Sequence, residues 1–230
     1  MRELKELTIT GKRSAGTSFK DLAISDCHFE GCYLSGQRLP GSWTSIRNIH
    51  LRNVKNSSCG IETAKFEACY VHNLTRQGKI PLFMWGCVYS EVSLSGKIGA
   101  IKMNRSVGAG EAAKADQAAW DRATKDFYAG VDWALDISSA KFAGSVSFEA
   151  IPGDKIRRDP ETQVLVTRQA LADERWRQLD FGRSGFEVAI SWFLQESLFD
   201  SVVLAARMGS GDAKSDIAVL RLLVDKGFAS

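Results

Sequence analysis

The cysteines and histidines are concentrated in the first half of the chain, where such residues could form a metal site or a reactive thiol. The five cysteines are Cys27, Cys32, Cys59, Cys69 and Cys87, and the three histidines are His28, His50 and His72. Zinc-binding cysteines usually occur as a closely spaced C-x₂-C pair, whereas the closest cysteines here are five residues apart. We therefore expect no metal site. The histidines have no nucleophile at an informative spacing, so we expect them on the surface.

Two short segments have residues that could bind a phosphate group. Residues 208–215 (MGSGDAKS) lie between a predicted strand and a predicted helix, but a P-loop needs glycine directly before its lysine, where this chain has Ala213. Residues 156–161 (IRRDPE) contain Arg157 and Arg158, whose guanidinium groups could hold an anion in a fork. A turn fixed by local ion pairs is the alternative for this pair. We predict a flexible loop for the first segment and keep the two arginines as candidate binding residues.

Composition and charge exclude several classes of protein. The chain has 230 residues, of which 44% are hydrophobic and 25% charged, as in ordinary globular domains. It has no apolar run of about 18 residues, and its charged start lacks the core of a signal peptide, so we expect a cytoplasmic protein without a membrane span. Residues 1–104 have 14 basic and 8 acidic side chains, a balance of +6, although the net charge of the whole chain is only +3.

A five-residue repeat dominates the first half. From Thr17 the blocks read TSFKD, LAISD, CHFEG, CYLSG and QRLPG, and after a slip they continue from Ile49 as IHLRN, VKNSS, CGIET, AKFEA and CYVHN. A third run reads LFMWG, CVYSE and VSLSG. Neither a helix nor a strand has this period. The repeat predicts a chain that turns a corner after every five residues. Four such sides form a coil of about 20 residues, and the coils stack about 4.8 Å apart as a solenoid.

The repeat assigns the cysteines to the core. All five occupy the first position of a block, which needs a small apolar side chain, so we expect buried structural thiols there. The third position is usually Leu, Ile or Phe. The predicted core therefore includes Cys27, Cys32, Cys59, Cys69, Cys87, Phe19, Phe29, Leu34 and Phe66.

These blocks resemble those of the pentapeptide-repeat proteins, over about residues 17–104 and again over 135–148. The resemblance implies a right-handed, four-sided parallel β-helix. It also implies a bacterial, non-enzymatic protein that binds another protein. The best-understood members bind type II DNA topoisomerases and protect them by imitating the shape and negative charge of duplex DNA. The +6 balance of this repeat region departs from that pattern.

The predicted fold class is a mainly β solenoid with an inserted helix and a C-terminal α/β cap or small module. The domains are 1–104 for the β-helix, 108–130 for the inserted helix, 131–150 for a return to the β-helix, and 151–230 for the C-terminal part. Within the last part we predict strands at 164–167 and 201–206, and helices at 170–180, 186–199 and 217–226, the last with Ser215 as its N-cap.

The function expected from the sequence is a non-catalytic protein-binding scaffold, with a role in bacterial defence or toxin immunity. We predict no catalytic residue, no cofactor and no metal, and we expect the apolar helix at 186–199 to be able to form a homodimer. Topoisomerase protection is one alternative, and an enzyme within residues 150–230 is another. A third alternative is nucleic-acid binding through the repeat's basic residues, for which the candidates are Arg38, Arg47, Arg52, Lys55, Lys65 and Arg76.

Overall fold

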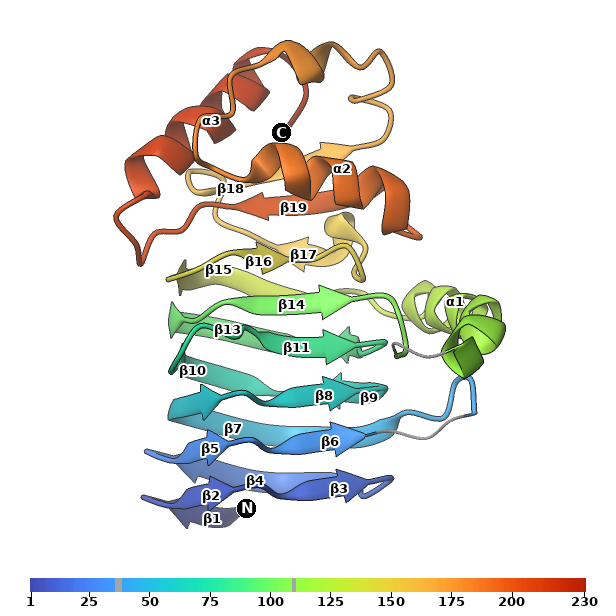
Figure 1. The fold of residues 1–230 in the computed structure, drawn as a ribbon, viewed down its shortest axis with the longest axis vertical. Coiled ribbons are helices and arrows are strands. Elements are labelled where there is room, and N and C mark those ends of the chain that lie inside the picture. The colour runs from blue at the N-terminus through green and yellow to red at the C-terminus, as the bar shows by residue number, and fades with distance from the viewer. Residues whose placement is uncertain (36–38, 109–110) are drawn as a thin grey trace.

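The computed structural model of the protein describes residues 1–35, 39–108 and 111–230. It contains two parallel β-sheets of 11 and 6 strands, a two-stranded antiparallel sheet and three α-helices (Figure 1). The mostly parallel, β-rich architecture predicted from the repeat is therefore confirmed. Neither parallel sheet closes on itself, because each strand order has two ends.

The chain passes alternately through the two parallel sheets. The main path of the first sheet is β1 (Arg2–Lys5), β4 (Phe19–Ser25), β7 (Thr44–Ser57), β10 (Tyr70–Arg76), β13 (Val92–Ile98), β15 (Leu135–Phe142) and β17 (Ile156–Arg157). Beside it lie β2 (Thr8–Thr10), β5 (His28–Glu30), β9 (Ala64–Glu67) and β12 (Val88–Ser90). The second sheet has the order β16 (Val146–Ser147), β14 (Ile101–Asn104), β11 (Leu82–Trp85), β8 (Gly60–Glu62), β6 (Tyr33–Ser35) and β3 (Arg13–Ala15).

Left-handed backbone residues mark the corners of the repeat. Their φ angles lie between +46° and +82°, and they fall at Glu6, Gly11, Gly16, Asp21, Asp26, Gly31, Gly41, Asn48, Asn53, Ser58, Thr63, Ala68, Asn73, Gly78, Gly86, Glu91 and Gly96. Most are five residues apart. Between Gly41 and Gly96, where every residue is described, the longer gaps are 41–48 and 78–86, and they coincide with the slips between the three runs of blocks. The corners also extend back to Glu6, so the repetitive structure begins before Thr17.

Side chains of one type stack across neighbouring strands of the first sheet. Leu4 pairs with Ile24, Ile24 with Leu51, Leu51 with Val71, and Val71 with Leu94. The first strands pair with strands 20 residues further along, for example Arg2 with Leu22. This apolar column lies at the third position of each block, which explains why that position is conspicuously apolar in the sequence.

The cysteine thiols form part of this interior. Cys27, Cys69 and Cys87 are buried, whereas Cys32 and Cys59 are only partly buried. Each thiol donates a hydrogen bond to a carbonyl of an earlier strand or corner, as from Cys32 to Ile9 at 3.2 Å. Burial raises the pKa of Cys87 to about 12, which keeps that thiol protonated. The other predicted core residues are partly buried and pack against the core: Phe19, Phe29, Leu34 and Phe66.

Helix α1 (Glu111–Ala129) leaves the sheets after β14 and packs on their side (Figure 1). Its Trp120 and Phe127 contact Trp43, each with ring centroids 5.7 Å apart. After the helix, β15 pairs with β13 and β16 pairs with β14, so the chain rejoins both sheets.

The C-terminal part covers one end of the sheets. It contains the 3₁₀ turns η1 (Gly153–Lys155) and η2 (Arg175–Gln178), the antiparallel strands β18 (Gln163–Thr167) and β19 (Ser201–Ala205), and the helices α2 (Phe186–Glu196) and α3 (Ala213–Asp225). Gln163 Nε2 donates to the Ile137 carbonyl at 2.9 Å, and the Gly209 N–H donates to the Phe142 carbonyl at 2.7 Å. One continuous apolar cluster therefore joins this module to the sheets.

Two sequence predictions for this module are wrong. The helix expected at 170–180 is replaced by turns and η2, because the Asp173 carboxylate accepts a hydrogen bond from the Arg175 N–H and Glu174 adopts a left-handed φ of 56°. Helix α3 starts at Ala213, with Asp212 rather than Ser215 at its N-cap. Within the described part of the chain, no helix has both the length and the apolar character needed to cross a membrane.

The corner at Asn53 offers a direct test of the left-handed backbone. Its amide donates to Asp26 Oδ1 at 3.0 Å and accepts from Asn73 Nδ2 at 2.9 Å. We expect Asn53→Ala to lower the free energy of unfolding by about 1–2 kcal/mol, because alanine keeps the Cβ that disfavours this conformation but loses the polar side chain with which asparagine offsets that cost. Asn53→Gly loses the same side-chain bonds but tolerates a positive φ, so it should cost less. Equal losses in urea titrations would show that backbone conformation is not what the corner requires.

Candidate functional site

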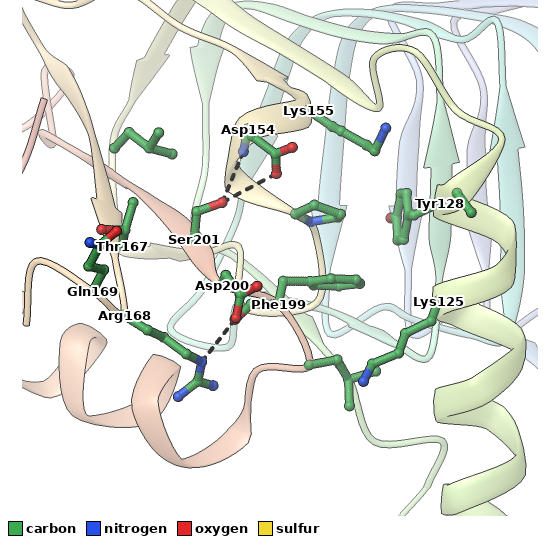
Figure 2. Close-up of a pocket in the computed structure, with 14 residues that line it drawn as sticks. Lys125, Tyr128, Asp154, Lys155, Thr167, Arg168, Gln169, Phe199, Asp200 and Ser201 are labelled. Atoms are coloured by element: carbon green, nitrogen blue, oxygen red, sulfur yellow. Dashed lines mark hydrogen bonds between the residues drawn. The ribbon is translucent and has the colours of Figure 1, made fainter. Parts of the chain in front are cut away.

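A cleft lies where α1 meets the C-terminal module. It has a volume of about 790 Å³ and is lined by residues from α1, η1, the end of β18 and the start of β19. Figure 2 shows Lys125 and Tyr128 on one side, Asp154 and Lys155 at the turn, and Arg168 facing the segment before β19.

Arg168 holds the end of α2 in place. Its guanidinium donates to four backbone carbonyls, those of Phe193 (3.2 Å), Leu194 (3.0 Å), Ser197 (2.8 Å) and Phe199 (3.0 Å). A cation in this position satisfies the carbonyls that a helix leaves unpaired at its C-terminus. The positive charge of Arg168 therefore stabilises the end of α2 and is not free to bind a ligand.

Three other polar side chains of the cleft, those of Ser201, Asp154 and Lys155, also bind groups of the protein itself. Ser201 Oγ accepts from the Asp154 N–H at 3.1 Å and donates to Asp154 Oδ1 at 3.3 Å, while Lys155 Nζ donates to the Val131 carbonyl. Among the described residues that line the cleft, none is a histidine or a cysteine. Ser201 therefore has a carboxylate neighbour but no histidine among these described residues that could activate it as a nucleophile.

A second concavity, the α2 groove, separates α2 from the second sheet. Its volume is about 320 Å³, and its apolar lining includes Phe83, Phe186, Val188 and Trp192. Figure 1 shows α2 beside β19, beyond β16 at the C-terminal end of the sheets. Phe186 is buried, but Val188 and Trp192 are 60% and 54% exposed. One turn apart on the helix, these two side chains form an apolar edge of the groove.

Aromatic rings continue this surface over the outer face of the second sheet. The aromatic row consists of Tyr33, Phe83 and Trp85. Phe83 and Trp85 are stacked with centroids 5.0 Å apart, and Tyr33 lies 6.4 Å from Trp85. The rings occupy the space above Gly60, where an added Cβ would lie 2.8 Å from Tyr33 and 3.1 Å from Trp85. Only glycine at this position leaves room for the rings.

Two acids accompany this apolar surface. Tyr33 Oη donates to Glu62 Oε2 at 2.9 Å, and burial followed by this bond raises the pKa of Tyr33 to about 12. Glu149 lines the α2 groove and is only 6% exposed. Desolvation raises the pKa of Glu149 above its ordinary value, and this effect outweighs the attraction of Lys102.

The basic residues predicted as binding candidates do not form one patch. Arg38 lies outside the described residues. Arg47, Arg52 and Lys55 are exposed on β7, but the corners at Asn48 and Asn53 separate them into three successive segments of the strand. The repeat thus distributes its positive charge over different sides.

The remaining basic candidates have partners within the protein. Lys65 forms an ion pair with Glu67 at 3.1 Å, and Arg76 donates to the Lys79 carbonyl at 2.6 Å. Arg157 lies over the ring of Trp133, 4.1 Å from its centroid. A separate bond of 3.2 Å joins Arg158 to the Ser230 carbonyl, so the two arginines do not act as a fork on one ligand.

The sequence did contain a signal for the aromatic row, which our sequence analysis missed. Tyr33 is the second residue of CYLSG, and Phe83 and Trp85 are the second and fourth residues of LFMWG. The repeat directs the second and fourth positions outward, so aromatic residues there indicate an exposed apolar surface.

No protein-family model matches the chain, and a comparison with curated proteins finds no match. The pentapeptide-repeat resemblance therefore depends on the chain's own residue pattern and geometry.

The loop expected to be flexible at 208–215 is anchored by a buried ion pair. Arg207 donates to both carboxylate oxygens of Asp216 at 2.7 Å, and Asp216 is fully buried. Arg207 also contacts Asp212, which is about half exposed, at 2.9 Å. We expect Asp216→Asn to lower the free energy of unfolding by about 3 kcal/mol, because it removes the buried counter-charge of the Arg207 guanidinium and leaves only the half-exposed Asp212 beside it.

The matched control for this ion pair is Asp212→Asn, which should cost less than about 1 kcal/mol because that carboxylate is solvated. Urea unfolding of both variants measures the difference. Similar losses of unfolding free energy in the two variants would mean that the burial of Asp216 does not strengthen its ion pair with Arg207.

The raised pKa of Glu149 predicts that the stability of the protein depends on pH. Since its pKa is raised in the folded state, the unfolded chain ionises first as pH increases from 4.5, and stability falls with rising pH. Glu149→Gln removes this effect, so we expect the variant to be more stable than wild type at neutral pH and the difference to vanish below pH 4.5. Thermal unfolding across this range tests the prediction, and a variant that is less stable at neutral pH would contradict it.

Proposed function

We propose that this protein is a non-catalytic scaffold of the pentapeptide-repeat type that binds another protein. In this proposal the two parallel sheets are sides of a right-handed, four-sided β-helix. The five-residue spacing of the left-handed corners supports it, as does the 20-residue offset between paired strands such as β1 and β4. The C-terminal module then serves as the cap of one end.

The observation that carries the binding function is the apolar surface formed by the aromatic row and the α2 groove. Aromatic side chains on a rigid sheet lose little conformational freedom when a partner covers them. Trp and Tyr are also the residues that most often dominate the free energy of protein–protein binding. Trp192 and Val188, exposed beside a groove of about 320 Å³, are suited to such contacts.

The polar groups support binding rather than catalysis. In the larger cleft, Arg168, Asp154 and Lys155 are bonded to neighbouring backbone or side-chain groups. The positive balance of the repeat opposes DNA imitation, and the separation of Arg47, Arg52 and Lys55 by corners opposes a nucleic-acid groove. A partner protein with an apolar epitope therefore agrees best with the exposed surface.

Partner capture with paired variants tests the proposal. Wild-type protein and the variant Val188→Ser/Trp192→Ala are immobilised and exposed to extract of the source cells, and retained proteins are identified by mass spectrometry. The matched control is Tyr70→Ala/Val224→Ser, because Tyr70 and Val224 are 50% and 42% exposed but do not line the groove. We expect the α2 variant, but not the control, to lose the partner.

The affinity of the identified partner is then measured with purified proteins. Loss of hot-spot contacts should weaken binding at least ~10-fold for the α2 variant and leave the control unchanged. Unchanged affinity of the α2 variant, or a loss confined to the control, would show that the binding surface lies elsewhere.

A further inference from the structure

One end of the parallel sheets is covered by the C-terminal module, whereas the other end is not covered by any described element. At one end, the C-terminal module covers the strands, with bonds such as that from Gln163 to the Ile137 carbonyl. At the other end, shown at the bottom of Figure 1, the strands β1, β2 and β3 each pair with a strand on one side only among the described residues. Their outer backbone groups form an open sheet edge, which is a template for pairing with another strand.

The apolar interior is also uncovered at this end. In the described part of the chain, no residue before Cys27 is buried. Leu7 is 42% exposed, whereas Cys27, its neighbour one strand further in, is 1% exposed. Leu4 heads the apolar column that ends at Leu94 and is itself only partly buried. A covering surface would remove these leucines from water.

The charges of β1 and its corner residue Glu6 are complementary to those of a second, antiparallel copy of the same segment. Residues 2–6 read RELKE, and all four charged side chains are exposed. When two such segments run antiparallel with Leu4 opposite Leu4, Arg2 lies opposite Glu6 and Glu3 lies opposite Lys5. Every charged pair then has opposite signs, and the apolar residue meets its own copy at the centre. Opposite charges stabilise cross-strand pairs, and like charges destabilise them.

We propose that β1 pairs in antiparallel orientation with β1 of a second copy, about a two-fold axis at Leu4, and so joins two chains end to end. The backbone groups of the open edge hydrogen-bond across the axis, as in other strand-addition contacts. A two-fold contact presents the same surface from both copies, which is the symmetry that the RELKE pattern requires. The aromatic row and α2 groove of each copy stay free in this arrangement, because they lie on the second sheet and at the opposite end.

The experiment measures the mass of the full chain by light scattering and sedimentation over a series of concentrations. Wild type should approach twice the chain mass of 25.3 kDa. Glu3→Lys puts like charges opposite each other on both sides of the axis and should raise the dimer dissociation constant about tenfold. The double variant Glu3→Lys/Lys5→Glu restores opposite signs and should restore the dimer.

A mixing experiment makes the test sharper. Glu3→Lys/Glu6→Lys makes the segment wholly basic, and Arg2→Glu/Lys5→Glu makes it wholly acidic. Each should be monomeric alone, and the two together should form a heterodimer. These side chains are exposed, so each variant should still unfold in one cooperative thermal transition, and a failure to dimerise is then not a failure to fold.

Other outcomes overturn the proposal. A wild-type mass of one chain at all concentrations excludes the contact. A dimer that ignores the charge variants but dissociates in Trp192→Ala places the contact on α2 instead. Because partner capture depends on the α2 groove and dimer formation depends on β1, either proposal can fail while the other holds.

Discussion

A left-handed residue at every corner is the constraint on which the rest of the structure depends. Ten of the described non-glycine residues between Glu6 and Glu91 adopt a positive φ, and each carries a conformational cost of about 1–2 kcal/mol. Side chains bonded along the corners offset part of this cost, as in the line from Asp26 through Asn53 to Asn73. The regular corners keep equivalent positions in register, so that apolar residues stack on apolar residues and the exposed positions remain free to carry binding groups.

The sequence predicts those parts of the fold that repeat or that have a strong local pattern. The blocks from Thr17 onward indicate the stacked strands, and the Ala-rich segment before Gly130 indicates α1. The start of the repeat was missed because Arg2 and Lys12 occupy first positions and Ser14 a third position, so the apolar signature is absent there although the corners persist. The prediction of a helix at 170–180 was wrong because the Asp173 side chain accepts a hydrogen bond from the Arg175 backbone N–H. Helix propensity alone does not indicate such a local side-chain hydrogen bond.

The candidate site was harder to predict because it depends on packing between distant segments. Phe83 and Trp192 line one groove, yet more than a hundred residues separate them in the chain. The sequence indicated arginines as candidate binding residues. In the structure, guanidinium groups instead contact a carbonyl, a tryptophan ring or a carboxylate of the protein, as in Arg158, Arg157 and Arg207. The half-buried aromatic residues Tyr33, Phe83 and Trp85 were informative only once the outward positions of the repeat were known. A periodic sequence thus specifies its interior more clearly than its function.

Helix α1 has a consequence for how such a chain can diversify. It departs after β14, yet β15 still pairs with β13 and β16 still pairs with β14, so an excursion of some thirty residues leaves the ladder intact. Long loops add little closure entropy when their ends are held together by a rigid frame. Corners of this scaffold are therefore natural grafting points, where evolution or a protein engineer can exchange whole recognition segments while the stack beneath them is preserved.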